Sequence, residues 1–180
     1  MNDILKSITE EEFKEEISIR FNNILTGFDN YSNALLVHKN QEKPFDEKEG
    51  DFINYFRDLL TIEEAVIVDF YIKNLDSESK ERLIEKLEGN DKEIILRHIN
   101  DEEIKSVYFK LETERLMDFI TRLNTREQFF CSIYLRKNSM TIWGNYNLSF
   151  PMFFKDENIL KVYEELANKN NLTLRDVSIK

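Results

Sequence analysis

The residue types that most often carry out chemistry are few in this chain and stand far apart. His38 and His98 are the only histidines, Cys131 is the only cysteine, and glycine occurs four times. Zinc sites need ligands at spacings such as CxxC or HExxH, and phosphate loops need clustered glycines. Neither pattern can be drawn here. The sequence therefore predicts no metal, no cofactor and no identifiable catalytic residue.

Cys131 could serve as a nucleophile only if a base lay beside it. It falls on the apolar face of a predicted strand, where a free thiol usually packs as a small hydrophobic group. A single cysteine cannot form an internal disulfide, and the first residues show no basic stretch followed by an apolar one. These features predict a cytoplasmic protein with Cys131 in its core.

Carboxylates, in contrast, are numerous and gather in two runs in the first half of the chain. Neither run has the spacing of a calcium-binding loop, and solvated surface is the ordinary interpretation of such runs. If they form a site, they would contact a positively charged partner. The candidate partner-binding carboxylates are Glu11, Glu12, Glu15, Glu47, Glu49 and Asp51.

The charge balance supports that kind of partner. Lys and Arg number 25 against 35 Asp and Glu, for a net charge of −10. Residues 1–100 hold 13 basic and 23 acidic side chains, whereas residues 101–180 hold 12 of each. An acidic surface repels phosphate backbones, so we expect a basic protein partner and no nucleic acid. No apolar run approaches the ~20 residues that span a bilayer, so no membrane association is expected.

One segment, residues 143–154, has an unusual composition. It contains the only Trp, one of the two Pro and three of the Phe residues. Aromatic side chains with a polar tip suit shaped contact surfaces. Together with two tyrosines on neighbouring predicted strands, this segment supplies the candidate binding residues Tyr108, Tyr134, Trp143, Tyr146 and Phe150.

Residues 101–180 must position these aromatics, and their hydrophobic periods alternate between two and 3.6 residues. Period two predicts strands, and the longer period predicts helices. The predicted strands cover 107–111, 129–135, 140–147 and 172–179, and the predicted helices cover 113–124 and 156–167. The order βαββαβ predicts a ferredoxin-like unit, a four-stranded antiparallel sheet with two helices on one face.

Residues 1–100 are predicted to be mainly helical, which makes the fold class α+β. Thr9 and Glu12 form a capping-box signature that opens a helix ending at Gly27. Further helices are predicted at 46–60, 65–75, 77–88 and 91–99. The β-branched residues in 65–75 keep a strand possible there, and 34–38 is either a strand or a loop.

Asp69 is a lone carboxylate within the apolar segment 65–75. If buried, it would need a partner, for which Arg57 and Arg97 are candidates. We expect the two parts, 1–100 and 101–180, to pack as one globular body.

Two interpretations of the aromatics remain open. Residues 1–100 could cover the open face of the sheet and turn the aromatics into an internal seam, or that face could be a recognition surface. We expect a non-enzymatic interaction protein, one concrete form being an immunity- or antitoxin-like inhibitor of a toxin that attacks nucleic acid. The alternative is a small-ligand sensor or an enzyme. Its pocket would lie between the helical region and the sheet, with Trp143, Tyr146 and one of His38, His98 or Arg136 in its lining.

Overall fold

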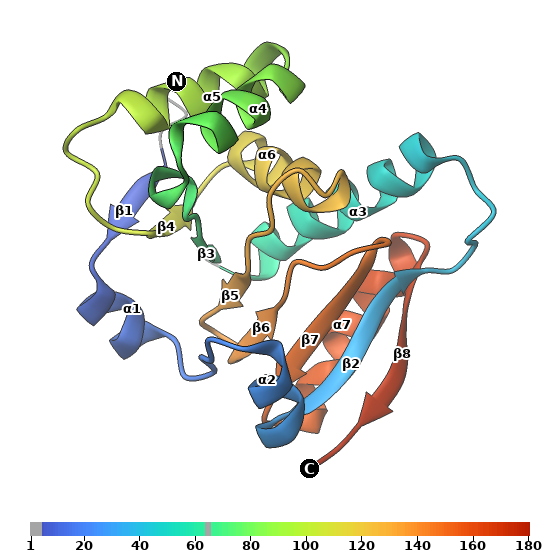
Figure 1. The fold of residues 1–180 in the computed structure, drawn as a ribbon. Helices are drawn as coiled ribbons and strands as arrows, with labels where there is room; N and C mark the ends of the chain where they lie inside the picture. Colours follow the sequence, from blue (N-terminus) through green and yellow to red (C-terminus); the bar gives the residue numbers. More distant parts are fainter. Residues whose placement is uncertain (1–4, 64–65) are drawn as a thin grey trace.

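The computed structural model describes residues 5–63 and 66–180, and its centre is one antiparallel sheet. Eight strands in the described residues follow the order β1-β4-β3-β5-β6-β7-β2-β8 (Figure 1). Their bounds are β1 (Lys6–Ile8), β2 (Ser32–His38), β3 (Val66–Asp69), β4 (Tyr108–Leu111), β5 (Ile133–Leu135), β6 (Met140–Ile142), β7 (Ser149–Phe154) and β8 (Leu172–Ser178). The α+β class predicted from the sequence is confirmed.

Helices lie on both sides of this sheet. Helices α3 and α6 run side by side on one side of it, while α1 and α2 lie near the opposite side (Figure 1). The helices are α1 (Glu10–Glu16), α2 (Ile24–Asn30), α3 (Phe45–Ile62), α4 (Ser77–Lys86), α5 (Gly89–Asn100), α6 (Glu114–Thr125) and α7 (Leu160–Lys169). Among the described residues, no helix combines the length and the apolar character needed to cross a membrane.

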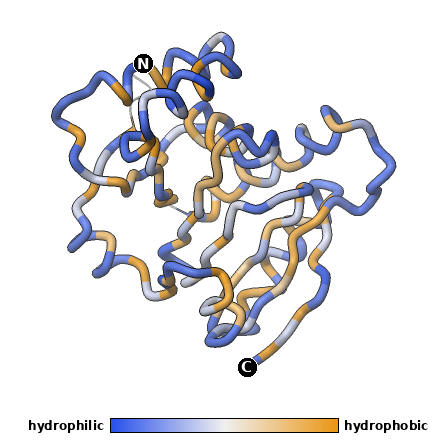
Figure 2. Tube along the Cα trace, viewed as in Figure 1, coloured by the Kyte–Doolittle hydropathy of each residue, from blue (hydrophilic) through white to orange (hydrophobic). Residues whose placement is uncertain are grey.

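The alternation of side chains along the strands divides the interior into two layers. Val66 and Val68 of β3 point into the main core with the aromatic side chains of α3 and α6, whereas Ile67 points to the second face of the sheet. Successive strand residues point to opposite faces, so a strand covered on both sides is apolar throughout. Figure 2 shows the result, with hydrophobic residues along the strands and hydrophilic residues over α4 and the loop before α3.

An N-terminal segment, residues 8–31, covers the second face. Ile8, Phe13 and Ile17 pack with Ile67 and Tyr134 in a small buried cluster. The hydroxyl of Thr141 on β6 donates a hydrogen bond to the carbonyl oxygen of Ile19 at 2.8 Å. This segment therefore provides the covering that the seam interpretation requires.

Three arginine–carboxylate pairs hold the helices of the main core together. Each guanidinium donates two hydrogen bonds to its carboxylate, a geometry that fixes orientation as well as charge. The pairs are Arg57–Asp118 and Arg126–Glu49 between α3 and α6, and Arg122–Asp91 between α6 and α5.

The ferredoxin-like prediction for residues 101–180 does not match the sheet. β4 pairs with β1 and β3, and β8 pairs with β2, so these strands take partners from the first hundred residues. β7, which sequence reasoning missed, lies between β6 and β2. Pro151 obscured it, because proline cannot donate to a sheet and usually argues against an inner strand. Strands from both sides of residue 100 are thus neighbours in one sheet, and the division of the chain at that residue stays a prediction.

The helix favoured for residues 65–75 is also wrong. Val66–Asp69 forms the fully buried strand β3, and Ile72–Asn74 forms a short 3-10 turn. A strand buried on both faces gives a continuous apolar run, which periodicity cannot distinguish from a buried helix. Thr61 and Glu64 also have capping-box spacing before this predicted helix, but Glu64 lies outside the described residues.

The first predicted helix is divided in two. The Thr9–Glu12 capping box is confirmed, but α1 ends at Glu16 and α2 begins after Asn23. Gly27 lies inside α2 instead of ending a helix. A Cβ atom there would lie 2.7 Å from the ring of Phe21, so glycine permits the close packing of α2 on this ring.

His98 on α5 is an unusual member of the main core. Its ring lies 4.9 Å from the rings of both Phe70 and Phe109, and 4% of the residue is exposed. Within the described part of the chain, neither ring nitrogen has a hydrogen-bond partner. Burial lowers the pKa of His98 to about 4; the charge of Lys73 adds to this effect and that of Asp101 opposes it.

This environment predicts a loss of stability in acid. Below its ordinary pKa of 6.5, the unfolded chain binds a proton at His98 that the folded chain binds only near pH 4. Burial of the neutral His98 ring therefore costs no stability above pH 6.5, whereas it lowers the free energy of unfolding by about 3 kcal/mol by pH 4. Urea unfolding of the wild type and of His98→Leu should show that the variant lacks this loss. A stability difference between the two proteins that stays constant with pH would contradict the prediction.

Candidate functional site

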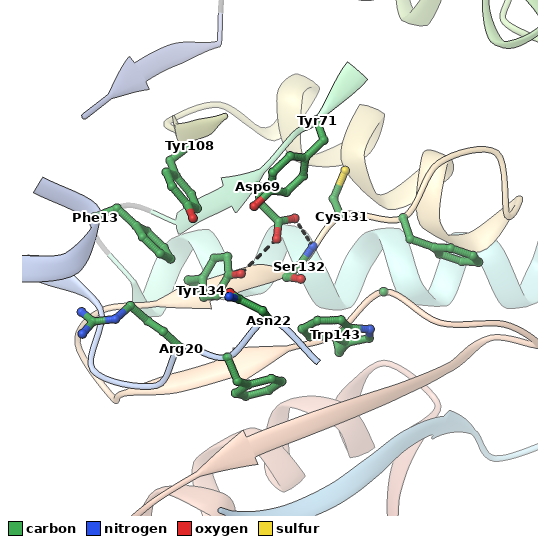
Figure 3. Close-up of a pocket in the computed structure, with 13 residues that line it drawn as sticks. Phe13, Arg20, Asn22, Asp69, Tyr71, Tyr108, Cys131, Ser132, Tyr134 and Trp143 are labelled. Carbon is green, nitrogen blue, oxygen red and sulfur yellow. Dashed lines mark hydrogen bonds between the residues drawn. The ribbon is translucent and has the colours of Figure 1, made fainter. Parts of the chain in front are cut away.

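A cavity of about 310 Å³ lies between the N-terminal segment and the second face of the sheet (Figure 3). We call it the aromatic pocket, because seven aromatic rings line it. These rings belong to Phe13, Phe21, Tyr71, Tyr108, Phe130, Tyr134 and Trp143. The rest of the lining comes from Arg20, Asn22, Asp69, Cys131, Ser132 and Gly144.

The aromatic walls are held by contacts between the two layers. Phe13 of α1 stacks on Tyr108 of β4 with ring centres 3.8 Å apart, and it meets Tyr134 of β5 edge-on at 4.9 Å. Phe21 stacks on Trp143 at 5.3 Å. Such pairs stabilise beyond the area that they bury, so they hold the N-terminal segment against the sheet around the pocket.

Asp69, at the end of β3, supplies the one carboxylate that the described residues contribute to the lining. The backbone N–H of Ser132 donates to its Oδ1 at 2.6 Å, and the hydroxyl of Tyr134 donates to its Oδ2 at 3.0 Å. Both donors belong to β5 or the residues just before it, which Figure 3 shows beside the carboxylate. Burial raises the pKa of Asp69, while these hydrogen bonds favour the charged form. The partners that the sequence suggested, Arg57 and Arg97, pair elsewhere with Asp118 and Glu93.

Arg20 is the one basic residue of the lining, but its charge is directed away from the carboxylate. Its guanidinium donates to the backbone carbonyl oxygens of Lys14 and of Ile17, the latter at 2.6 Å. These oxygens lie at the C-terminal end of α1, where a positive charge is favoured. The aromatic pocket therefore combines π faces with a carboxyl group.

Cys131 and Gly144 form the wall nearest to α6. Burial raises the pKa of the Cys131 thiol well above its usual value, so it stays protonated. A Cβ atom on Gly144 would lie 2.8 Å from the carbonyl oxygen of Cys131, which explains a glycine at this close approach. Neither histidine lines the pocket, so the wall holds no thiol–imidazole pair.

Among the described residues, no group of three His, Cys, Asp or Glu side chains is placed to hold a metal ion. What the arrangement can do is bind a group that carries positive charge or hydrogen-bond donors, through one carboxylate and several aromatic faces.

The structure brings together three of the five candidate aromatic residues. Tyr108, Tyr134 and Trp143 line the pocket. Tyr146 lies outside it, 58% exposed, with its ring against Phe130 at 4.7 Å. Phe150 points to the other face of the sheet and is fully buried in the main core, because it occupies an inward position of β7.

Sequence reasoning missed the residues that the N-terminal segment and the end of β3 contribute. Phe13 and Phe21 both fall within the single helix that the sequence predicts up to Gly27, and such a helix gives no sign of their contact with distant strands. Asp69 had one usable signal, a lone carboxylate in an apolar run. That signal predicts a need for donors, but it does not say which ones.

The acidic candidates fall into two separate groups. Glu11, Glu12 and Glu15 are exposed on α1, where Glu12 also caps the helix through the backbone N–H of Thr9 at 2.7 Å. The second group, Glu47, Glu49 and Asp51, lies near the start of α3, at the opposite end of the molecule from α1 in Figure 1.

The α3 group is mostly used inside the fold. Glu49 is buried and bonded to Arg126 and Thr125, Asp51 accepts from His38 at 2.9 Å, and Glu47 pairs with Lys43 at 3.3 Å. The α1 group and Glu47 therefore remain available to a partner, whereas Glu49 and Asp51 are engaged within the fold.

Comparisons of this chain with protein-family models, with curated proteins and with solved structures find no match. The fold and the site define an α+β protein with an aromatic pocket whose lining includes the carboxylate of Asp69. Its function has to be inferred from that pocket and the surface around it.

The different surroundings of Glu49 and Glu47 predict different effects of the same substitution. Glu49→Gln removes a buried charge that Arg126 and Thr125 satisfy, so we expect a loss of about 2 kcal/mol in the free energy of unfolding. The matched control Glu47→Gln affects only an exposed pair and should cost less than ~0.5 kcal/mol. Denaturant unfolding of both variants measures the difference. Equal effects would show that the carboxylate of Glu49 is solvated.

Proposed function

We propose that this protein is a non-enzymatic, cytoplasmic interaction protein that binds a basic partner protein through α1 and the rim of the aromatic pocket. One observation carries the proposal: α1 presents Glu11 and Glu15 to solvent while its Phe13 forms a wall of the pocket. An acidic surface and an aromatic depression therefore lie side by side. Aromatic anchors beside charged rims are typical of protein interfaces.

The overall charge favours the same kind of partner. A protein with a net charge of −10 attracts basic surfaces over a distance, which raises the rate of encounter. A toxin that attacks nucleic acid must bind phosphate groups through Lys and Arg. An immunity- or antitoxin-like inhibitor of such a toxin is thus one concrete form of the proposal, in which the carboxylates of α1 would take the place of the phosphates.

The proposed cytoplasmic location rests on Cys131. The thiol is free and buried, and the chain has no second cysteine with which it could form an internal disulfide. Proteins in oxidising compartments commonly rely on disulfides, whereas reducing compartments keep thiols free.

A second candidate function, a small-ligand sensor or an enzyme, is favoured by the cavity itself. The cavity lies between the N-terminal segment and the sheet, and its volume is at the lower end of the roughly 300–1,000 Å³ typical of ligand sites. The lining differs from the one expected for this function, since it contains Arg20 in place of His38, His98 or Arg136.

Affinity capture from the native host at low salt, followed by titration calorimetry with the purified partner, tests the proposal. The variant Glu10→Gln/Glu11→Gln/Glu15→Gln on α1 should bind the basic partner about tenfold more weakly than the wild type, and this difference should shrink as salt is added. The matched control Glu78→Gln/Glu81→Gln/Glu85→Gln removes the same charge from exposed positions on α4 and should change the affinity less than about twofold.

Two results would count against the proposal. Equal weakening by the α1 and α4 variants would mean that only total charge matters and that α1 is not the contact. Recovery of no basic protein at low salt, together with a small molecule that raises the melting temperature, would favour the second candidate function.

A further inference from the structure

The aromatic pocket has a carboxylate that is not fully used by the fold. A charged carboxylate can accept about four hydrogen bonds. Asp69 accepts one at each oxygen from β5 and its flank, and it remains part of the cavity lining. The hydrogen bonds from Ser132 and Tyr134 use two of these four positions, and the surrounding Tyr71, Tyr134 and Trp143 contribute π faces (Figure 3).

We propose that this pocket receives the cationic head of an arginine or lysine side chain from the basic partner, between the aromatic walls and the carboxylate of Asp69. This inference rests on the proposed function and adds the residue type that would anchor the complex. Guanidinium and ammonium groups are attracted to the faces of aromatic rings and to carboxylates.

The charges around the cavity favour a cation over an anion or a neutral group. Asp69 contributes a carboxylate, and Arg20, the one basic residue of the lining, donates to the carbonyl oxygens of Lys14 and Ile17. Burial makes the charge of Asp69 costly and raises its pKa. A bound cation offsets that cost, because opposite charges attract strongly where water is excluded.

The size and the surroundings favour a side chain of a protein over a free cofactor. About 310 Å³ is little space for a nucleotide-sized molecule, and the lining has no glycine-rich loop for phosphates. Phe13 lines the pocket and belongs to α1. The exposed carboxylates of α1 would contact further basic residues of the same partner. The net charge of −10 makes a basic partner the complementary one.

The fluorescence of Trp143 tests the inference directly, since it is the only Trp and lies in the pocket wall. Nα-acetyl-arginine amide and Nα-acetyl-lysine amide are the cationic probes. Nα-acetyl-citrulline amide has nearly the shape of the arginine probe without its charge. We expect at least one cationic probe to change the emission and to bind at least about tenfold more tightly than the citrulline probe.

Substitutions of pocket residues distinguish binding of the cation by Asp69 from attraction by the overall negative charge of the protein. Asp69→Asn should weaken binding of the cationic probe about tenfold or more, whereas Asp29→Asn, which removes an exposed carboxylate on α2, should leave it unchanged. Tyr71→Ala provides a second variant with little risk to folding, because Tyr71 is 39% exposed, and it should weaken binding severalfold. Circular dichroism confirms that each variant is folded.

The outcomes distinguish this inference from the proposed function. If the basic partner binds the wild type, Asp69→Asn and Tyr71→Ala equally well, and the citrulline probe binds as tightly as the arginine probe, the inference is wrong while the proposed function stands. If a cationic probe binds but no basic partner does, a free organic cation is the ligand. That result would contradict both the proposal that a side chain of the partner occupies the pocket and the proposed function.

Discussion

The carboxylate of Asp69 is buried at the end of β3, the strand that joins the β1-β4 edge of the sheet to the other five strands. A buried charge is costly unless donors surround it, and here the donors are the Ser132 backbone and the Tyr134 hydroxyl. These bonds hold the end of β3 against β5 and set the ring of Tyr134 as a wall of the pocket. One electrostatic requirement thus connects the middle of the sheet with the candidate site.

The second face of the sheet has features of both interpretations that the sequence left open, the internal seam and the recognition surface. The N-terminal segment covers this face, and Phe13 and Phe21 stack on Tyr108 and Trp143, as in an internal seam. The covering is incomplete, however, and a cavity remains between the same rings. The seam and the candidate site are therefore parts of one layer.

Much of the secondary structure could be predicted because its signals are local. The Thr9–Glu12 capping box and the amphipathic periods of α3 and α6 each depend on neighbours a few residues away. The alternation of side chains along the predicted strands also puts Tyr108, Tyr134 and Trp143 on one face of the predicted sheet. It could not reveal β3, whose residues are buried on both sides, or β7, whose Pro151 resembles a strand breaker.

The sequence by itself determined the α+β class, the capping of the first helix and the concentration of negative charge in residues 1–100. Only the tertiary structure decided which strands pair, why Glu49 is internal while Glu11 is exposed, and which donors satisfy Asp69. The physical reason is the range of the interactions. Periodicity and capping act within one element, whereas strand pairing, burial and the satisfaction of a buried charge depend on residues that are distant in the chain and meet only when it folds.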